Sequence, residues 1–271
     1  MRDRKSASPI GVFDSGIGGL TVAQAIVGEL PRERLVYFGD TAHLPYGDKS
    51  TAAIQAYAVK ICDLLLRQHC KVILIACNSA SAAAYELVKE YVGSKALVLN
   101  VIDPVVEYIG KTYAGKTIGL IGTKQTVNSN VYLKKVDALD LNITLKSHAT
   151  PLLAPMIEEG FFNDSISENV IHAYLSAPEL QGIEALILGC THYPLIKKQI
   201  ANYYQGKVDV LDASQIVAKH ARSFLEVNDL VSEELLGDHA FYVSDFTRSF
   251  EESTRIFFNR KVQLEHYPLW E

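Results

Sequence analysis

The sequence lacks any apolar run that could cross a membrane, since about 20 consecutive apolar residues are needed. It also lacks basic runs, repeat arrays and low-complexity tracts, and its net charge of -5 at pH 7 gives no sign of nucleic-acid binding. Residues 1–9 are polar, and the apolar stretch Ile10–Phe13 is shorter than the core of about 7–15 residues that a signal peptide needs. We therefore expect a cytoplasmic protein with no membrane anchor and no nucleic-acid partner.

Cysteine is scarce, with four in 271 residues, at positions 62, 70, 77 and 190. No two of them form the Cys-x-x-Cys pair that is typical of zinc clusters, so we expect no bound metal. In the cytoplasm the four should be reduced thiols rather than disulfides. The composition is 48% hydrophobic and 21% charged, as in a globular protein, and the length allows one large or two modest α/β domains.

Short apolar runs alternate along the chain with amphipathic stretches. Most runs are continuously apolar, which is typical of parallel strands buried on both faces. Helical spacing predicts a helix over 51–68, and Asp103 and Ser214 are predicted to cap two more. This alternation predicts α/β layers around a parallel sheet. The predicted strands are 10–13, 35–38, 72–76, 97–101, 117–121, 143–147, 185–188, 208–211 and 241–244.

A weak internal duplication is visible. The string Ile10–Asp14 resembles the string Ile118–Thr123, and each is followed much later by a strand that ends in a cysteine, Cys77 or Cys190. The pattern indicates either two similar α/β units that face each other or two ordinary strand–helix units that resemble each other by chance.

Polar residues at the carboxyl ends of the predicted strands are the candidates for chemistry, because ligands of open parallel sheets bind beyond these ends. Asp14, Asp40, Cys77 and Cys190 lie at or just past such ends. A cysteine at the start of a helix meets a positive potential, which lowers its pKa from about 8.5 and favours the thiolate. Simple burial is the alternative for either cysteine, since free cysteine is among the most buried residue types. Two thiols in matched positions favour a catalytic pair.

Two further segments are candidates for ligand binding. The glycine-rich string 14–20 resembles turns that bring backbone N–H groups towards an anion at a helix N-terminus. It matches neither the dinucleotide fingerprint nor the Walker loop, and a merely tight turn is the alternative. Segment 40–47 is a polar loop of the kind that binds ligands. His192, close after Cys190, could either poise that thiol or cap the helix predicted there.

Four strings occur in order along the chain: Asp14-Ser15-Gly16-Ile17-Gly18-Gly19, Pro45-Tyr46-Gly47, Cys77-Asn78-Ser79-Ala80-Ser81 and Gly189-Cys190-Thr191-His192-Tyr193-Pro194. Together they resemble the glutamate racemases. The resemblance runs from Ile10 to Val210 and is weaker past Asp212. One departure is Ser79, where the family usually has threonine; the hydroxyl group is retained.

The resemblance implies roles for individual residues. The implied catalytic residues are Cys77, Cys190, Asp14, Glu158 and His192. Glu159 is the alternative for the glutamate, because it is the neighbour of Glu158 in the segment that the family uses. Asp40 and Thr123 match second-tier positions near the site. Substrate contacts are implied at Asp14, Ser15, Tyr46, Gly47, Asn78, Ser79, Thr191 and His192.

The resemblance also implies a reaction. The family interconverts L- and D-glutamate without pyridoxal phosphate, metal or other cofactor, and the D-glutamate supplies peptidoglycan synthesis. Two bases are needed, because one fixed side chain cannot reach both faces of a bound carbon. Thiols at Cys77 and Cys190 meet that need, with one as thiolate while the other is thiol.

The fold that the resemblance implies is α/β, with two similar doubly wound parallel-sheet lobes, the active site between them, and usually a homodimer. We expect residues 1–99 and 213–271 to form the first lobe and residues 100–212 the second. Three alternatives are open. They are a related aspartate or hydantoin racemase, a non-catalytic two-lobe protein that binds amino acids, and a zinc hydrolase that uses Cys77, Cys190 and His192.

Overall fold

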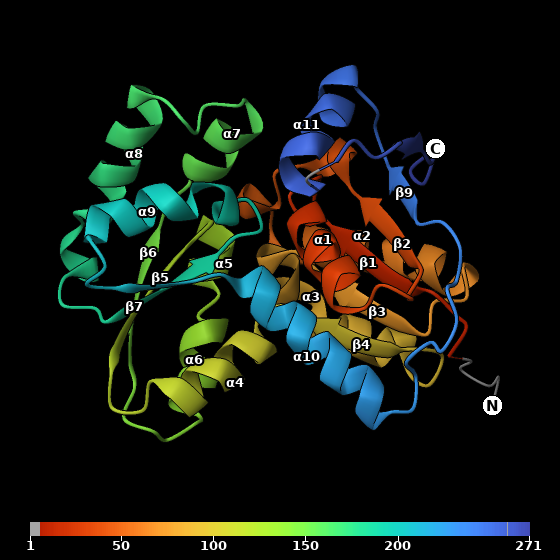
Figure 1. Cartoon of the computed structure of the whole chain (residues 1–271), viewed down its shortest axis with the longest axis horizontal. Coiled ribbons are helices and arrows are strands. Elements are labelled where there is room, and N and C mark those ends of the chain that lie inside the picture. Colours follow the sequence, from red (N-terminus) through yellow and green to blue (C-terminus); the bar gives the residue numbers. More distant parts are fainter. Residues whose placement is uncertain (1–5, 259) are drawn as a thin grey trace.

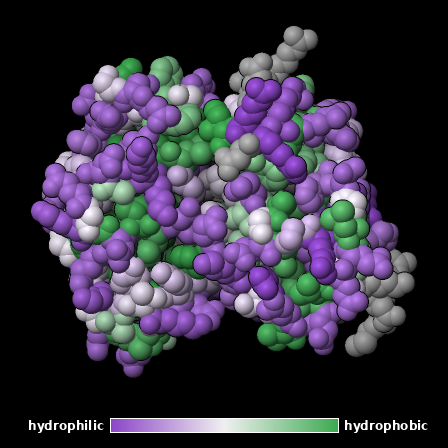
Figure 2. Space-filling view, viewed as in Figure 1, coloured by the Kyte–Doolittle hydropathy of each residue, from purple (hydrophilic) through white to green (hydrophobic). Residues whose placement is uncertain are grey.

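Two parallel β-sheets, each covered by helices, form the two lobes of the molecule (Figure 1). The computed structural model describes residues 6–258 and 260–271. Residues 1–5 lie outside the described residues, and with them part of the polar segment in which no signal peptide is expected. No helix in the described part of the chain has the length and apolar character to cross a membrane. Hydrophilic residues predominate on the face shown in Figure 2.

Within the described residues, every pair of neighbouring strands is parallel. The first sheet, in the order β10-β9-β2-β1-β3-β4, consists of β1 (Ile10–Asp14), β2 (Leu35–Gly39), β3 (Val72–Ile75), β4 (Leu97–Asn100), β9 (Ala240–Val243) and β10 (Glu265–His266). The second sheet, in the order β6-β5-β7-β8, consists of β5 (Thr117–Gly122), β6 (Thr144–Ala149), β7 (Ala185–Gly189) and β8 (Asp209–Leu211).

The sheets share one topology. The order β2-β1-β3-β4 in the first lobe corresponds to β6-β5-β7-β8 in the second, and both follow a doubly wound pattern. The two similar strings form β1 and β5, and the strands that precede the cysteines, β3 and β7, are the neighbours of β1 and β5. The predicted α/β fold with two similar parallel-sheet lobes is therefore confirmed.

All nine predicted strands are present, with their ends shifted by no more than two residues. The sequence pattern missed β10, because a strand of two exposed residues leaves no apolar run to detect. The chain leaves the first sheet after β4 and returns to it with β9. On this path we base the proposal that residues 1–99 and 213–271 form one lobe and residues 100–212 the other.

Helices connect the strands and cover the sheets. The α-helices are α1 (Leu20–Glu29), α2 (Thr51–Arg67), α3 (Asn78–Val92), α4 (Asp103–Thr112), α5 (Lys124–Asn128), α6 (Val131–Asp137), α7 (Leu153–Glu158), α8 (Ser165–Leu175), α9 (Lys197–Tyr204), α10 (Ala213–Val227) and α11 (Arg248–Phe258). Short 3-10 helices are η1 (Thr41–His43), η2 (Tyr46–Asp48), η3 (Pro178–Leu180) and η4 (Tyr193–Ile196).

The predicted caps of two helices are wrong. Asp103 is the first residue of α4, whose N-cap is Ile102, and the backbone N–H of Asp103 donates at 2.8 Å to the side chain of Asn100. At α10, the carboxylate of Asp212 accepts from the backbone N–H of Ser214 at 3.0 Å. In both cases the capping residue lies nearer the preceding strand than expected, so the strand end and the helix start are joined directly.

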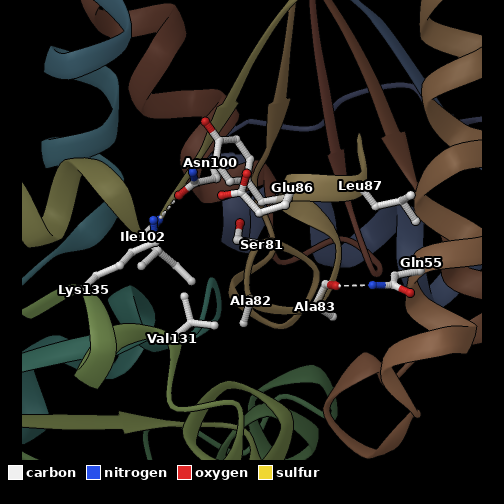
Figure 3. Close-up of a pocket in the computed structure, with 11 residues that line it drawn as sticks. Gln55, Ser81, Ala82, Ala83, Glu86, Leu87, Asn100, Ile102, Val131 and Lys135 are labelled. Carbon is white, nitrogen blue, oxygen red and sulfur yellow. Dashed lines mark hydrogen bonds between the residues drawn. The ribbon is translucent and has the colours of Figure 1, made fainter. Parts of the chain in front are cut away.

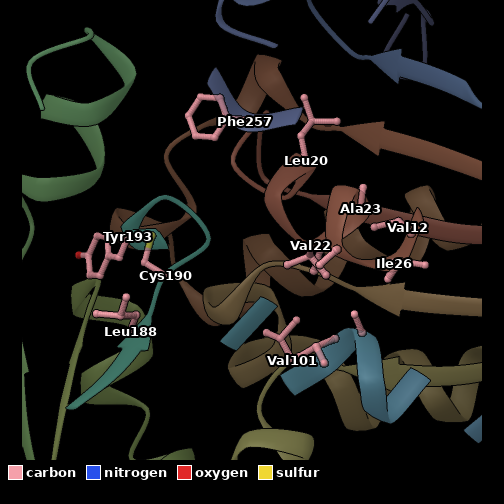
Figure 4. Packing of buried hydrophobic residues seen from close by; sticks show 14 of the residues in the cluster. Val12, Leu20, Val22, Ala23, Ile26, Val101, Leu188, Cys190, Tyr193 and Phe257 are labelled. Carbon is pink, nitrogen blue, oxygen red and sulfur yellow. The ribbon is translucent and has the colours of Figure 1, made fainter. Parts of the chain in front are cut away.

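The largest apolar cluster includes buried residues of both lobes. Figure 4 shows Leu20 of α1 on the side of the first lobe, Leu188 and Tyr193 on the side of the second, and Phe257 of α11 above Cys190. The two lobes are therefore packed against each other around the carboxyl ends of β1 and β7.

Candidate active site

A pocket lies between the lobes, where the central strands of both sheets end. Strands β1 and β3 approach it from the first lobe, and β5 and β7 from the second. The lining residues are Ser15, Pro45, Tyr46, Gly47, Cys77, Asn78, Ser79, Thr123, Ala154, Glu158, Gly189, Cys190, Thr191 and His192. The pocket is thus built from the segments that follow the strand ends.

Most of the residues that the sequence predicted line this pocket, but two do not. Asp14 is fully buried behind it, and Asp40 is fully buried beneath Tyr46. Glu158 is a lining residue, whereas its neighbour Glu159 is exposed and is not among them. Ala154 was missed. It lies one helical turn before Glu158 on α7, so the spacing of four residues could have indicated it.

Cys77 is the N-cap of α3 and is almost fully buried. Its Sγ accepts from the backbone N–H of Ala80 at 3.4 Å and donates to Oγ of Ser15 at 3.6 Å. Burial, followed by the charge of Asp14, raises the pKa of the thiol to about 12, although the Ala80 N–H acts to lower it. The expected fall in this pKa is therefore wrong, because loss of solvation outweighs the helix terminus.

Cys190 follows β7, and its surroundings differ from those of Cys77. The next element is the short 3-10 helix η4, so the α-helix expected directly behind this thiol is absent. Instead, Nδ1 of His192 lies 3.5 Å from Sγ of Cys190, and Nε2 of the same ring lies 2.8 Å from Oε1 of Glu158. His192 therefore contacts both the thiol and a carboxylate, and although it is the N-cap residue of η4, its side chain makes no capping hydrogen bond.

The pKa of His192 is well above its usual value. Burial alone would lower it, but the hydrogen bond and charge of Cys190, together with those of Glu158, outweigh the burial. The imidazole is thus protonated at neutral pH, and it places a positive charge next to Cys190.

Asp14 occupies the anion-binding turn that its own string forms. Its Oδ2 accepts from the backbone N–H groups of Gly16 at 3.2 Å and Gly19 at 2.8 Å. Its Oδ1 has no hydrogen-bond partner among the described residues. Burial raises the pKa of the carboxyl, while the charge of His192 and the backbone donors lower it. The glycine-rich turn therefore holds an internal carboxylate rather than a bound phosphate.

Asp40 supports one wall of the pocket from behind. The hydroxyl of Tyr46 donates to its Oδ2 at 2.6 Å, and the Oδ1 accepts from Ser244 at 2.7 Å and from the indole of Trp270 at 2.8 Å. Ser244 and Trp270 come from the C-terminal part of the chain. Asp40 thus joins this part to the loop that carries Tyr46.

The lobes meet closely at the rim of the pocket. The hydroxyls of Ser79 and Thr123, from opposite lobes, lie 2.8 Å apart. A Cβ at Gly18 would lie 2.6 Å from Nδ1 of His192 and 2.7 Å from Oγ1 of Thr191. Because real Cβ atoms do not come so near, only glycine lets the first lobe approach His192 this closely.

The site shows no arrangement typical of a metal centre. Within residues 6–258 and 260–271, no three or more His, Cys, Asp or Glu side chains are grouped so that they could hold a metal ion. The chemistry available from the described residues is therefore that of two thiols, an imidazolium, carboxylates and neutral N–H and O–H donors.

Known proteins resemble this chain in both sequence and fold. The sequence profile described as Asp/Glu/Hydantoin racemase matches residues 10–221. A glutamate racemase of Chlorobium phaeobacteroides is 39% identical over 254 residues, which cover 92% of each chain. The chain belongs to the glutamate racemases of this family. It is accordingly an amino-acid racemase, an isomerase.

Solved structures of glutamate racemases have the same architecture. The enzyme of Francisella tularensis, in complex with D-glutamate, superposes with a TM-score of 0.91 at 39% identity and covers 98% of this chain and 99% of its own. The enzyme of Bacillus anthracis superposes with a TM-score of 0.90 at 31% identity and covers 96% of this chain and 97% of its own. The chain therefore shares its overall fold with these two glutamate racemases.

Proposed function

We propose that this protein interconverts L- and D-glutamate by a two-base mechanism that uses Cys77 and Cys190 and no cofactor. The observation that carries the proposal is that the two thiols line one pocket from opposite lobes. The D-glutamate complex of the Francisella tularensis enzyme supports glutamate as the substrate. A binding protein without catalysis has no need of paired thiols, so the arrangement favours an enzyme.

The pKa of Cys77 and the contact between Cys190 and His192 support a direction for each proton transfer. Cys77, with a pKa of about 12, is a thiol at neutral pH, and we assign the thiolate to Cys190, whose Sγ lies 3.5 Å from Nδ1 of His192. In this state Cys190 takes the α-proton of L-glutamate, so that the Cα–H bond breaks and an S–H bond forms. Cys77 gives its own proton to the opposite face. D-Glutamate leaves a Cys77 thiolate and a Cys190 thiol, from which the reverse reaction starts.

The intermediate carries negative charge on a carbon beside a carboxylate, and it needs preorganised donors in a site closed to water. The N-terminus of α3 behind Cys77 supplies backbone dipoles. Asn78, Ser79 and Thr191 add side-chain donors to the lining. Asp14 acts from behind the pocket, where its charge raises the pKa of Cys77 and lies near His192.

The proposal extends to the biological setting of the reaction. We infer a cytoplasmic homodimer that supplies D-glutamate for peptidoglycan synthesis, since these properties accompany the family resemblance. Aspartate and hydantoins are the competing substrates within the family. A substrate panel with purified protein separates them from glutamate.

Hydrogen exchange tests the two-base mechanism. In deuterated water the product enantiomer should carry solvent deuterium from the first turnovers, because the thiol that protonates it has exchanged with solvent. The remaining substrate should stay largely unlabelled at early times. Chiral separation followed by mass spectrometry measures both. Efficient transfer of the original hydrogen into product would instead require a single base.

Removal of metals and carbonyl cofactors should leave the activity unchanged. The described residues offer thiols for both proton transfers and no cluster for a metal. The expected result is full racemisation after exhaustive chelation, and again after treatment with a carbonyl reagent and dialysis. Racemisation that disappears and returns with zinc or with pyridoxal phosphate would overturn the cofactor-independent thiol mechanism.

A further inference from the structure

Tyr132 of the second lobe contacts a pocket residue of the first lobe. Its hydroxyl donates to Oδ1 of Asn78 at 2.8 Å, and both residues are buried. The ring of Tyr132 packs in an apolar cluster of the second lobe. Its neighbours on α6, Val131 and Lys135, line a cavity of about 110 Å³ whose other side is formed by α3 (Figure 3). The hydrogen bond thus joins α6 to the first residue of α3.

The pocket must bind an anion without a cationic side chain of lysine or arginine. No lysine or arginine is among the described residues that line it. Two carboxylates of glutamate therefore depend largely on neutral donors. A serine or threonine hydroxyl rotates to suit its partner, but a carboxamide has one donor end and one acceptor end. Among the described residues of the lining, Asn78 is the only carboxamide, so the orientation of its amide decides whether it attracts or repels a carboxylate.

The hydroxyl of Tyr132 selects one of the two orientations of the side-chain amide of Asn78. A phenol that is 1% exposed must place its proton on an acceptor, and Oδ1 of Asn78 is that acceptor. With Oδ1 accepting from Tyr132, the two N–H groups on Nδ2 are the donors that the side chain of Asn78 can offer to the pocket that it lines. If the amide were reversed, the phenol proton would lose its acceptor, and a carbonyl oxygen would face the substrate.

We propose that Tyr132 is a positioning residue, which holds Asn78 with its amide N–H groups towards a carboxylate of the substrate. This inference rests on the proposed racemisation of glutamate. Because Tyr132 and Asn78 belong to different lobes, the donor is correctly set only when the lobes are packed as they are here. Substrate recognition is thereby coupled to the closure of the pocket.

The test is the variant Tyr132→Phe, which keeps the ring and its packing but removes the donor. KM for glutamate should rise about tenfold, as for one hydrogen bond to a charged group, while kcat changes less than about twofold and the pH profile of kcat is unchanged. In an Asn78→Ala background the same change should have no further effect on KM. Tyr113→Phe is the matched control. Like Tyr132, Tyr113 is buried; its hydroxyl donates to the carboxylate of Asp209 at 3.0 Å, and neither residue lines the pocket. This variant should therefore leave KM unchanged.

Two results would overturn the inference. One is a KM of Tyr132→Phe equal to that of the parent enzyme, and the other is an effect on KM that persists in full without Asn78. Asn78→Asp gives a test that does not depend on the folding of a Tyr132 variant. It keeps the acceptor for Tyr132 but loses the donor, so normal glutamate binding by Asn78→Asp also refutes the role. Failure of the unmodified protein to racemise glutamate would instead refute the proposed function.

Discussion

Replacement of either Cys77 or Cys190 by alanine should abolish the racemisation of glutamate in both directions. Each thiol is proposed to serve one face of the α-carbon, so neither thiol can take the place of the other in the pocket that both line. We expect a loss of about 10⁴-fold or more, the upper end for lost acid–base assistance. The measurement is chiral separation of the products formed from L- and from D-glutamate, with circular dichroism to verify the fold.

The other two cysteines provide matched controls. Cys62 and Cys70 are buried in an apolar cluster of the first lobe that also includes Cys77, but unlike Cys77 neither of them lines the pocket. Burial raises the pKa of both, to about 12 in the case of Cys70. Cys62→Ala and Cys70→Ala should therefore keep nearly full turnover. If Cys77→Ala or Cys190→Ala behaved in the same way, the strand-end thiols would be core residues, as the burial alternative holds.

The predictable parts of the fold are those that depend on the order of apolar and polar residues within a short stretch of sequence. Continuous apolar runs identify buried parallel strands, and the position of a polar residue directly after a run places it at the carboxyl edge of the sheet. Cys77 and Cys190 were assigned to opposite halves of one site on this basis, and the structure brings both to one pocket. Nothing comparable marks β10, which has only two residues.

Properties that depend on packing were not predictable. The pKa of Cys77 was expected to fall because the local sequence starts a helix, but the thiol is buried beside Asp14, and loss of solvation raises the pKa. Likewise, the contact from Tyr132 to Asn78 joins residues 54 positions apart in different lobes. No periodic pattern in the sequence predicts a contact between two residues that far apart in the chain.

The variant His192→Asn should lower turnover by about 10²-fold or more, the low end for lost acid–base assistance. It removes the imidazolium next to Cys190, so the thiolate there loses its neighbouring positive charge. The loss should be seen in protein that thermal unfolding shows to be folded at the assay temperature. Normal turnover with a large fall in stability would instead mean that His192 stabilises the turn after β7 and takes no part in the reaction.

The variant Glu158→Gln tests the same group through pH. Cys190 and Glu158 raise the pKa of His192 against the effect of burial, so in the parent enzyme the proton leaves only as the pH rises through that raised value. Below the ordinary histidine pKa of about 6.5, the contribution of this proton to the stability of the fold is fully present. That contribution is lost as the pH rises through the raised pKa of His192, on the alkaline limb of the pH profile. Without the carboxylate, the pKa of His192 falls. The decline of kcat/KM for L-glutamate should then begin at a lower pH.

Glu159→Gln is the control for this experiment, since Glu159 is exposed and does not line the pocket. Its pH profile should match that of the parent enzyme. A shift of the alkaline limb in Glu159→Gln but not in Glu158→Gln would move the assisting role to the neighbouring residue. A limb unchanged in both variants would mean that the contact of 2.8 Å between Glu158 and His192 does not control the proton on the imidazole. The thiolate at Cys190 would then depend on other charges of the pocket.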